Sequence, residues 1–267
     1  MVVLNTKYIL GTLSGITTGI VSAARRALDL IDLSEHSGGH PRKGTVDLIP
    51  IHPISNLTTL ADCGQVALNI GSQLKATHPK LSIFYFGHAD IPENRDLVQR
   101  RKDIGWFQND PFPSTHGISG IGAIPYMSNF NVMIKCSDLD IGQRIAKSLR
   151  QRSGGLLGVQ SMAFPHGDNQ IEIACNVDLV LFDDKDEKQV NAKAQGKFVK
   201  SFGDYYMTPF EVIHKEITDK AKEFNCHVIG ESVIIGFTPK EAFELTTKAM
   251  AQNDSWLVGK INRNIQM

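Results

Sequence analysis

An excess of charge of either sign is missing from this sequence. Lysine and arginine together number 28, and aspartate and glutamate also number 28. Non-specific binding to nucleic acid or to an acidic membrane surface needs a basic excess, so we expect neither partner. Apolar runs approaching the roughly 18 residues that span a bilayer are also missing. Without a basic segment and apolar run at the N-terminus, no secretory signal is visible, and we expect a cytoplasmic protein.

Cysteine is scarce as well. Four cysteines lie far apart in the sequence and form no CxxC pair: Cys63, Cys136, Cys175 and Cys226. Each falls in a predicted helix or at a strand end, so we expect buried, reduced thiols. An apolar share of 42% over 267 residues indicates a globular chain. Its length suits two modest domains or one large one.

Alternating helix and strand patterns run through the first half. Strands are predicted at 2–10, 46–50 and 81–86, and helices at 15–30, after Thr58 or Thr59, and over 93–102. In the helix at 15–30 the apolar stripe is expected at Ile16, Ile20, Ala23, Ala27 and Ile31. Residues 105–125 are rich in glycine and proline and show little periodicity, which predicts a long loop.

Two groups of side chains in this half leave alternatives open. The cations Arg95, Arg100, Arg101 and Lys102 form either a solvated helix face or a site for an anionic ligand. Trp106 and Phe107 either fill the core beneath the predicted loop or stack on a flat heterocycle.

The second half has a clearer pattern. Strands are predicted at 129–136, 159–164, 171–181 and 228–237, and helices at 138–152, from 208 to 224, and from 239. The order β-α-β-β-α-β is that of a ferredoxin-like split βαβ unit, joined to a related α/β layer in the first half. The polar segment 183–204 is assigned no element. The glycines Gly154 and Gly155 are interpreted as a helix stop rather than a phosphate loop.

The segment from Ser37 to Pro50 combines two glycines, a histidine before a proline and a short apolar run. A residue before proline is pushed into extended backbone, so His40 is expected on a stiff loop at the start of a strand. An imidazole presented in this way is a candidate catalytic base. The alternative is an ordinary surface histidine in a turn.

Several stretches together resemble one family. The run Gly39-His40-Pro41-Arg42-Lys43-Gly44, with Asp47 and Pro50, is similar to the GxHPRxGxxDxxPF signature of the formiminotransferase domain of formiminotransferase-cyclodeaminase. Weaker similarities are found at 31–36, 84–89, 153–159, 173–177 and 232–239. Residues 95–107 resemble the formiminotransferase N-terminal subdomain-containing proteins more closely. The resemblance covers nearly the whole chain in the right order.

This resemblance implies the overall class and partners. It implies an α/β (α+β) fold of two ferredoxin-like subdomains with mixed, helix-covered sheets and a folate groove between them. Residues 1–126 would be the N-terminal subdomain, without the family's first strand and helix, and 127–267 the C-terminal one. It also implies a cytoplasmic homodimer without a metal, active in histidine catabolism and one-carbon metabolism.

The implied reaction is transfer of a formimino group from N-formiminoglutamate to tetrahydrofolate, the co-substrate. The family's catalytic histidine falls on His40. The folate-contact loop falls on the tract before Gly117, which gives the candidates Phe112, Thr115, His116 and Gly117.

The chemistry suits these residues. One histidine near neutral pKa can take a proton from the attacking folate nitrogen and return it to the departing glutamate nitrogen. Asp47 either fixes the tautomer of that imidazole or is a polar residue at the start of a strand. Arg42 either pairs with a substrate carboxylate or is a solvated loop charge.

Departures from the family pattern favour a second possibility. The chain begins after the family's first strand, has no arginine near Asn5, and carries His88 where the family tends to have glutamate. These features predict, as the alternative, a catalytically impaired folate-binding protein. A metal-dependent hydrolase using His36, His40 and His116 is disfavoured, because Gly38, Gly39 and Pro41 oppose the helix that such a spacing needs.

Overall fold

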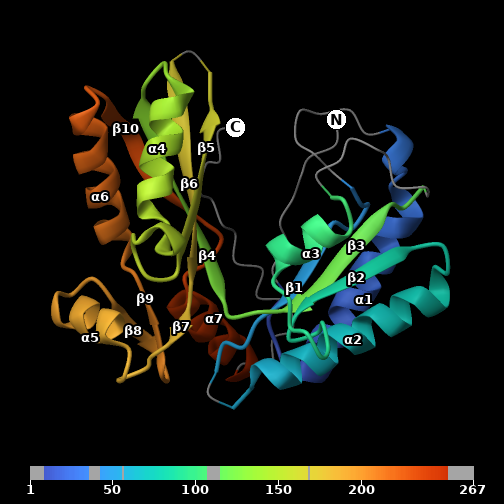
Figure 1. Ribbon diagram of the computed structural model, residues 1–267. Coiled ribbons are helices and arrows are strands. Elements are labelled where there is room, and N and C mark those ends of the chain that lie inside the picture. The colour runs from blue at the N-terminus through green and yellow to red at the C-terminus, as the bar shows by residue number, and fades with distance from the viewer. Residues whose placement is uncertain (1–8, 36–42, 56, 107–114, 168, 252–267) are drawn as a thin grey trace. The chain divides into compact units, whose positions relative to one another are not determined.

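The computed structural model describes residues 9–35, 43–55, 57–106, 115–167 and 169–251. The chain divides between Ile124 and Pro125 into two compact units, which are described separately. Its elements are traced in Figure 1. Within the described ranges, no helix has both the length and the apolar content that a membrane span requires.

The first unit is built on a parallel three-stranded sheet. Its strands are β1 (Leu48–Ile51), β2 (Ser82–Gly87) and β3 (Ile118–Ala123). The order is β1-β3-β2, with Leu48 opposite Gly120 and Phe84 also opposite Gly120. The predicted loop at 105–125 is therefore wrong in its second part, because β3 is the central strand. All six of its residues are buried, so the polar–apolar alternation that marks a half-exposed strand is absent.

The glycines of β3 have a packing reason. A Cβ on Gly122 would lie 2.5–2.6 Å from the ring of Phe86, and one on Gly120 would lie 2.5 Å from the ring of Phe84. Both rings come from β2 and lean over the central strand on one face of the sheet. Glycine, usually a sign of a turn, here makes room for aromatic side chains.

Two hydrophobic cores cover the two faces of this sheet. On one face lie α1 (Leu13–Leu30) and α2 (Leu60–Thr77), packed on Ile49, Ile51 and Ile121. On the other face Phe84, Phe86, Trp106 and Ile118 form a smaller core beside α3 (Leu97–Asp103). Figure 1 shows α3 on one side of the sheet and α1 and α2 on the other. Trp106 thus fills the core, as one of its two interpretations held, while Phe107 lies outside the described residues.

Helix α2 begins where the sequence indicates, whereas α1 begins at Leu13 rather than at 15 and α3 begins at Leu97 rather than at 93. The side chain of Thr59 accepts from the backbone of Asp62, whose carboxylate accepts from the backbone of Thr59, so α2 starts with a capping box. In α1 the buried stripe is Thr17, Val21, Ala24 and Leu28. The expected stripe was one position away, and Ile16 and Ile20 are only partly buried against the core. A 3₁₀ turn, η1 (Leu33–Glu35), follows α1.

Part of the predicted first strand lies outside the described residues. Of residues 2–10 only Ile9 and Leu10 are described, and they belong to no strand. The described strands of the first unit are all parallel. A ferredoxin-like arrangement for this half therefore stays a prediction.

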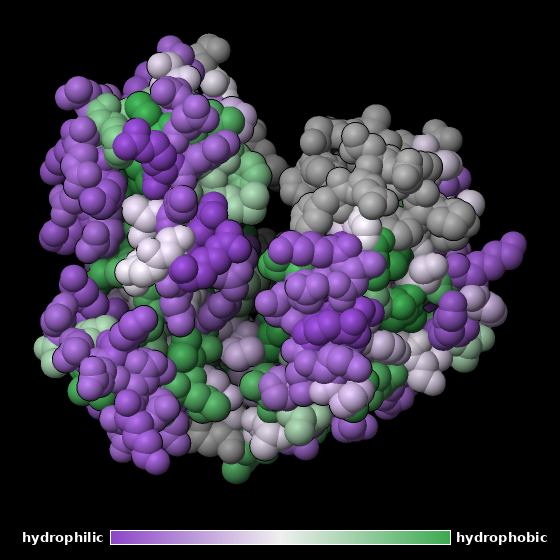
Figure 2. Space-filling model, viewed as in Figure 1, coloured by the Kyte–Doolittle hydropathy of each residue, from purple (hydrophilic) through white to green (hydrophobic). Residues whose placement is uncertain are grey.

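The second unit is built on a four-stranded antiparallel sheet. Its strands are β4 (Met127–Lys135), β5 (Val159–Pro165), β6 (Gln170–Asp178) and β10 (His227–Ile235), in the order β10-β4-β6-β5. The helices α4 (Leu139–Leu149) and α6 (Phe210–Glu223) pack on this sheet and on each other. The predicted β-α-β-β-α-β order is found for the four strands of this sheet and its two helices, with further elements inserted between β6 and α6. In Figure 2 the outer surface of α6 is largely hydrophilic, as expected when Ile213, Ile217 and Ala221 face inward.

The polar segment 183–204 does contain structure. It holds α5 (Glu187–Ala194) and β8 (Val199–Phe202), and β8 joins β7 (Val180–Leu181) and β9 (Tyr205–Met207) in a small sheet of order β7-β9-β8. The remaining elements are η2 (Gln151–Ser153) and α7 (Pro239–Ala251). Gly154 caps η2 with φ of 84°, which supports the interpretation of Gly154 and Gly155 as a stop.

Candidate active site

Two candidate loops meet at the amino ends of β1 and β3. The segment 43–47 leads into β1, and Thr115, His116 and Gly117 lead into β3. Thr45 N donates to His116 O at 2.9 Å, and Ile118 N donates to Lys43 O at 2.9 Å. The sequence predicted each loop as a site separately, and the parallel pairing of β1 and β3 brings the described parts of both together.

Gly117 is required by the backbone. Its φ is +67°, in the left-handed region, and a Cβ there would collide with the carbonyl group of Lys43. Gly44, opposite it in an isolated antiparallel bridge, is equally crowded by the carbonyl group of Ile118. The described contacts of Gly117 thus give it a structural role in joining the two loops.

His116 carries an unsatisfied polar atom. Its Nδ1 is buried and, among the described residues, has no hydrogen-bond partner. The ring meets that of His78 edge-on, with 5.6 Å between ring centroids and an interplanar angle of 80°. A buried imidazole nitrogen without a partner is costly, which marks His116 as a candidate for contact with a ligand. Thr115 is exposed, and its carbonyl oxygen accepts from Leu33 N at 3.3 Å.

The imidazole of His78 lies beside an aspartate. His78 Nε2 lies 3.3 Å from Asp29 Oδ1, and the His78 side chain is 13% exposed. Hydrogen bonds from Ser34, with a smaller contribution from the nearby charge of His116, lower the pKa of Asp32. Sequence reasoning missed His78 and Asp29. The one available signal was the dipeptide His78-Pro79, which repeats the histidine-before-proline pattern of His40.

Asp47 lies at the junction of the loop and β1. Its Oδ1 accepts from Lys43 N at 3.4 Å, and its carbonyl oxygen accepts from Gly120 N at 2.9 Å. The side chain is half-buried. The charge of Asp47 also acts on Arg101 in α3. Burial lowers the pKa of Arg101, and the Asp47 carboxylate opposes this shift. The alternative in which Asp47 orients the imidazole of His40 stays a prediction.

The other candidates fall outside the description. His40, Arg42 and Phe112 lie outside the described residues, as does His36 of the metal hypothesis. Within the described part of the chain, no group of three or more His, Cys, Asp or Glu side chains is arranged to hold a metal ion.

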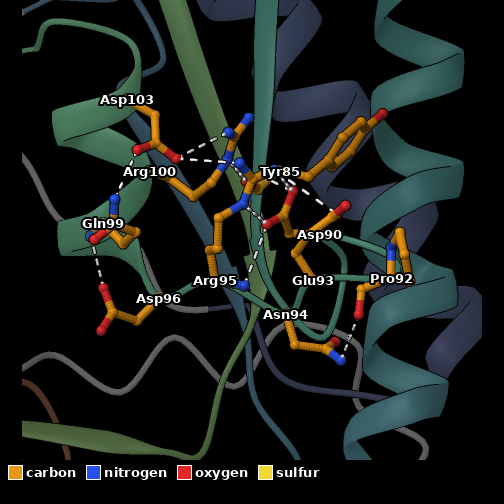
Figure 3. Close-up of polar contacts among 10 residues, drawn as sticks. All are labelled: Tyr85, Asp90, Pro92, Glu93, Asn94, Arg95, Asp96, Gln99, Arg100 and Asp103. Carbon is orange, nitrogen blue, oxygen red and sulfur yellow. Dashed lines mark hydrogen bonds and ion pairs between the residues drawn. The ribbon is translucent and has the colours of Figure 1, made fainter.

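The basic run of α3 and its preceding loop is, as a group, neither a solvated helix face nor a site for an anionic ligand. Arg95 Nε donates to Asp90 Oδ2 at 2.7 Å and Arg95 Nη2 to Asp90 Oδ1 at 3.0 Å. Arg100 Nε donates to the carbonyl oxygen of Tyr85 at 2.9 Å, and both arginines contact Asp103. Figure 3 shows the two guanidinium groups between the carboxylates of Asp90 and Asp103. The ion pairs and hydrogen bonds of Arg95 and Arg100 therefore connect the loop after β2 with α3.

Comparison with known proteins agrees with the sequence signature. Residues 5–118 match the model of the formiminotransferase domain, N-terminal subdomain. A formiminotransferase cyclodeaminase-like protein of Arabidopsis thaliana is 32% identical over 195 residues, which are 62% of this chain and 63% of that protein. A glutamate formimidoyltransferase of Thermoplasma acidophilum is 31% identical over 170 residues, 57% of this chain and 55% of that protein.

A further relative extends over most of the chain. A glutamate formimidoyltransferase of Streptococcus pyogenes serotype M1 is 28% identical over 251 residues, 86% of this chain and 75% of that protein. This chain spans less than two thirds of the length of the Arabidopsis and Thermoplasma relatives.

Proposed function

We propose that this chain transfers a formimino group from N-formiminoglutamate to tetrahydrofolate, since residues 5–118 match the model of the formiminotransferase domain, N-terminal subdomain. The observation that carries the proposal is the family match, which includes the run Gly39-His40-Pro41-Arg42-Lys43-Gly44. Two of the relatives are named glutamate formimidoyltransferase. We propose further that residues 127–267 act as the C-terminal subdomain, since the Streptococcus relative aligns over 86% of this chain.

The proposed reaction assigns one role to His40. A nitrogen of tetrahydrofolate attacks the amidine carbon of the donor and loses a proton to the imidazole of His40. The tetrahedral intermediate then collapses: the bond between carbon and the glutamate nitrogen breaks, and the imidazolium returns the proton to that nitrogen. Glutamate leaves, and the formimino group stays on the folate. A group that titrates near neutral pH can serve in both steps.

The described residues support this assignment by their location. Asp47 and His116 lie on the two segments that are bridged beside the amino ends of β1 and β3. Asp47 provides a carboxylate for the ring nitrogen of His40 that does not face substrate. His116, with its buried Nδ1, and Thr115 provide polar groups for the folate. The resemblance also implies a homodimer, which sedimentation of the purified protein would test.

The experiment compares the protein with a His40→Ala variant. Formation of formiminotetrahydrofolate is measured with both substrates, and tetrahydrofolate binding is measured by calorimetry. We expect His40→Ala to lose turnover by a factor on the order of 10² to 10⁴ and to keep folate binding. His227→Ala, which removes an exposed histidine of the second unit, is the matched control and is expected to keep full activity.

Three results would contradict the proposal in different ways. Full turnover in His40→Ala would end its catalytic role. Folate binding without turnover in the unaltered protein would identify a catalytically impaired binding protein. Neither binding nor turnover would end the proposed function altogether.

A further inference from the structure

Three arginines lie close together in the sequence but differ in their partners. Arg95 and Arg100 each contact the carboxylate groups of Asp90 and Asp103. Arg101 has no carboxylate within ion-pair distance among the described residues, although it is half-buried. Its Nε is fully buried and has no hydrogen-bond partner in the described part of the chain.

Such an arginine is unusual in a folded protein. Buried guanidinium groups are almost always paired, and a buried donor without a partner loses its hydration without compensation. Burial accordingly lowers the pKa of Arg101. Arg95 and Arg100 show that cations of this segment can be paired with carboxylates of the same unit. The exception calls for a partner that the described part of the chain does not supply.

Trp106 holds the guanidinium in one orientation. The Arg101 Cζ lies 4.7 Å from the centroid of the Trp106 ring, and that ring is buried against Phe84. Stacking on an immobile aromatic face fixes the plane of the guanidinium and offers its N–H groups as a preorganised fork. A carboxylate is the planar group that such a fork binds through two parallel hydrogen bonds.

The location of Arg101 connects it with the candidate active site. The charge of Asp47 acts on Arg101, and Asp47 belongs to the segment that follows the histidine-proline-arginine run. The two side chains form no ion pair within 4.0 Å, so the N–H groups of Arg101 are not taken up by this carboxylate. The carboxylate of Asp47 instead favours the charged form of Arg101, which opposes the lowering of its pKa by burial.

We propose that Arg101 binds a carboxylate group of a substrate and thereby determines specificity for glutamate-bearing ligands. This inference rests on the proposed function. The carboxylate has two possible sources, the glutamate half of the formimino donor and the glutamyl tail of the folate. Both present the same chemistry to the guanidinium.

The test uses Arg101→Gln, Arg101→Lys and a matched control. Lys102→Gln removes the adjacent positive charge from the same helix, but at an exposed position. The kcat and KM of each protein are measured with N-formiminoglutamate and with tetrahydrofolate carrying one or three glutamates. Binding of tetrahydrofolate and of N-formiminoglutamate is measured separately by calorimetry, which does not depend on turnover. Far-UV circular dichroism and the melting temperature verify folding.

Arg101→Gln is expected to raise the KM and Kd of one substrate roughly 10- to 100-fold, the size of the effect of losing a charge-assisted hydrogen-bond pair. Arg101→Lys is expected to recover part of this loss, because it keeps the charge but not the fork. Lys102→Gln is expected to change either constant less than about twofold. A change confined to N-formiminoglutamate identifies the donor carboxylate. A change confined to tetrahydrofolate identifies the tail, and there the number of glutamates shows which carboxylate is bound.

The proposal is overturned if Arg101→Gln and Lys102→Gln have the same constants for both substrates while the unaltered protein turns over. In that case the proposed formimino transfer is supported and only the proposed role of Arg101 is rejected. If the unaltered protein binds but does not turn over, the calorimetric arm still decides the role of Arg101. If it does neither, the proposed function fails first and the assignment of Arg101 fails with it.

Discussion

Gly44 and Gly117 face each other in an isolated antiparallel bridge that joins the segment before β1 to the segment before β3. In the sequence 72 residues separate the two glycines, and the chain returns to the same end of the sheet. Because each glycine leaves no room for a Cβ against the opposite carbonyl group, the bridge depends on the absence of both side chains. This contact joins the described parts of the two candidate loops.

Gly117→Ala should destabilise the protein. It combines a left-handed φ of +67° with a collision against the Lys43 carbonyl group, and we expect a loss of about 2–3 kcal/mol in the free energy of unfolding. Gly154→Ala is the control, since its φ is +84° but no atom lies within 4 Å of the added Cβ; it should cost about 1 kcal/mol. Urea titration followed by far-UV circular dichroism measures both. Equal losses would show that the collision contributes nothing.

Gly122→Ala should be rescued in part by Phe86→Leu. The added methyl group meets the ring of Phe86 and should cost about 1–3 kcal/mol. Phe86→Leu alone leaves a space in a fully buried position and should cost about 1–2 kcal/mol. In the double variant the methyl group occupies that space, so the total loss should be smaller than the sum by at least about 0.5 kcal/mol. Strict additivity would contradict the packing argument, and Gly11→Ala, with open space around its Cβ, is the control.

Asp90→Asn should lower stability and flatten its dependence on acid pH. The Asp90 side chain is 8% exposed, and the hydrogen bonds from Arg95 lower its pKa. Because the folded pKa lies below the unfolded value of about 3.9, the contribution of this pair is complete above that value and is lost as the pH falls through the folded pKa. At neutral pH we expect a loss of about 2–3 kcal/mol.

The control for Asp90 is a second carboxylate near the same arginine. Glu93 is 53% exposed and lies 3.8 Å from Arg95, so Glu93→Gln should change stability by less than about 1 kcal/mol. Thermal melts between pH 2.5 and 7 measure both variants. The same acid dependence in Asp90→Asn as in the unaltered protein would exclude Asp90 as its source.

The buried cysteines should resist alkylation. Burial raises the pKa of Cys63 and of Cys175 to about 12, and that of Cys226 to about 11. The reactive species is the thiolate, so at pH 8 less than about one thiol in a thousand is ionised at these positions. Iodoacetamide labelling followed by mass spectrometry should be slow in the folded protein and fast in urea. Rapid labelling of Cys63 without urea would contradict its burial.

Periodicity in the sequence predicted the elements that bury one face. Strand β4 alternates Phe130, Val132 and Ile134, and α2 buries Val66 and Ile70 behind its capping box. Such elements carry their own signal, because one face meets a core and the other meets water. The antiparallel sheet of the second unit was therefore predictable.

Elements without two different faces could not be predicted in this way. Strand β3 is buried throughout and carries glycines whose reason lies in Phe84 and Phe86 of another strand. Helix α5 is mostly polar, and among its residues only Gln189 is buried. Local sequence cannot contain a packing reason that is supplied by a distant segment.

The candidate site was predictable in part. The two loops were each marked by glycine, proline and histidine, but their bridging is a result of the pairing of β1 with β3. The contact of His116 with His78 joins residues 38 positions apart, and nothing near either residue indicates it. For Arg101, composition showed only a basic run; the pairing of Arg95 and Arg100 distinguishes it from its neighbours.

The order of the parallel sheet has a consequence for synthesis of the chain. In the described ladders β1 and β2 each pair with β3, which stands between them, and not with each other. A nascent chain that has left the ribosome only as far as Gly117 therefore contains two strands without the one that joins them. Helices α1 and α2 can form early, but the sheet on which they pack closes only after Ala123 has emerged.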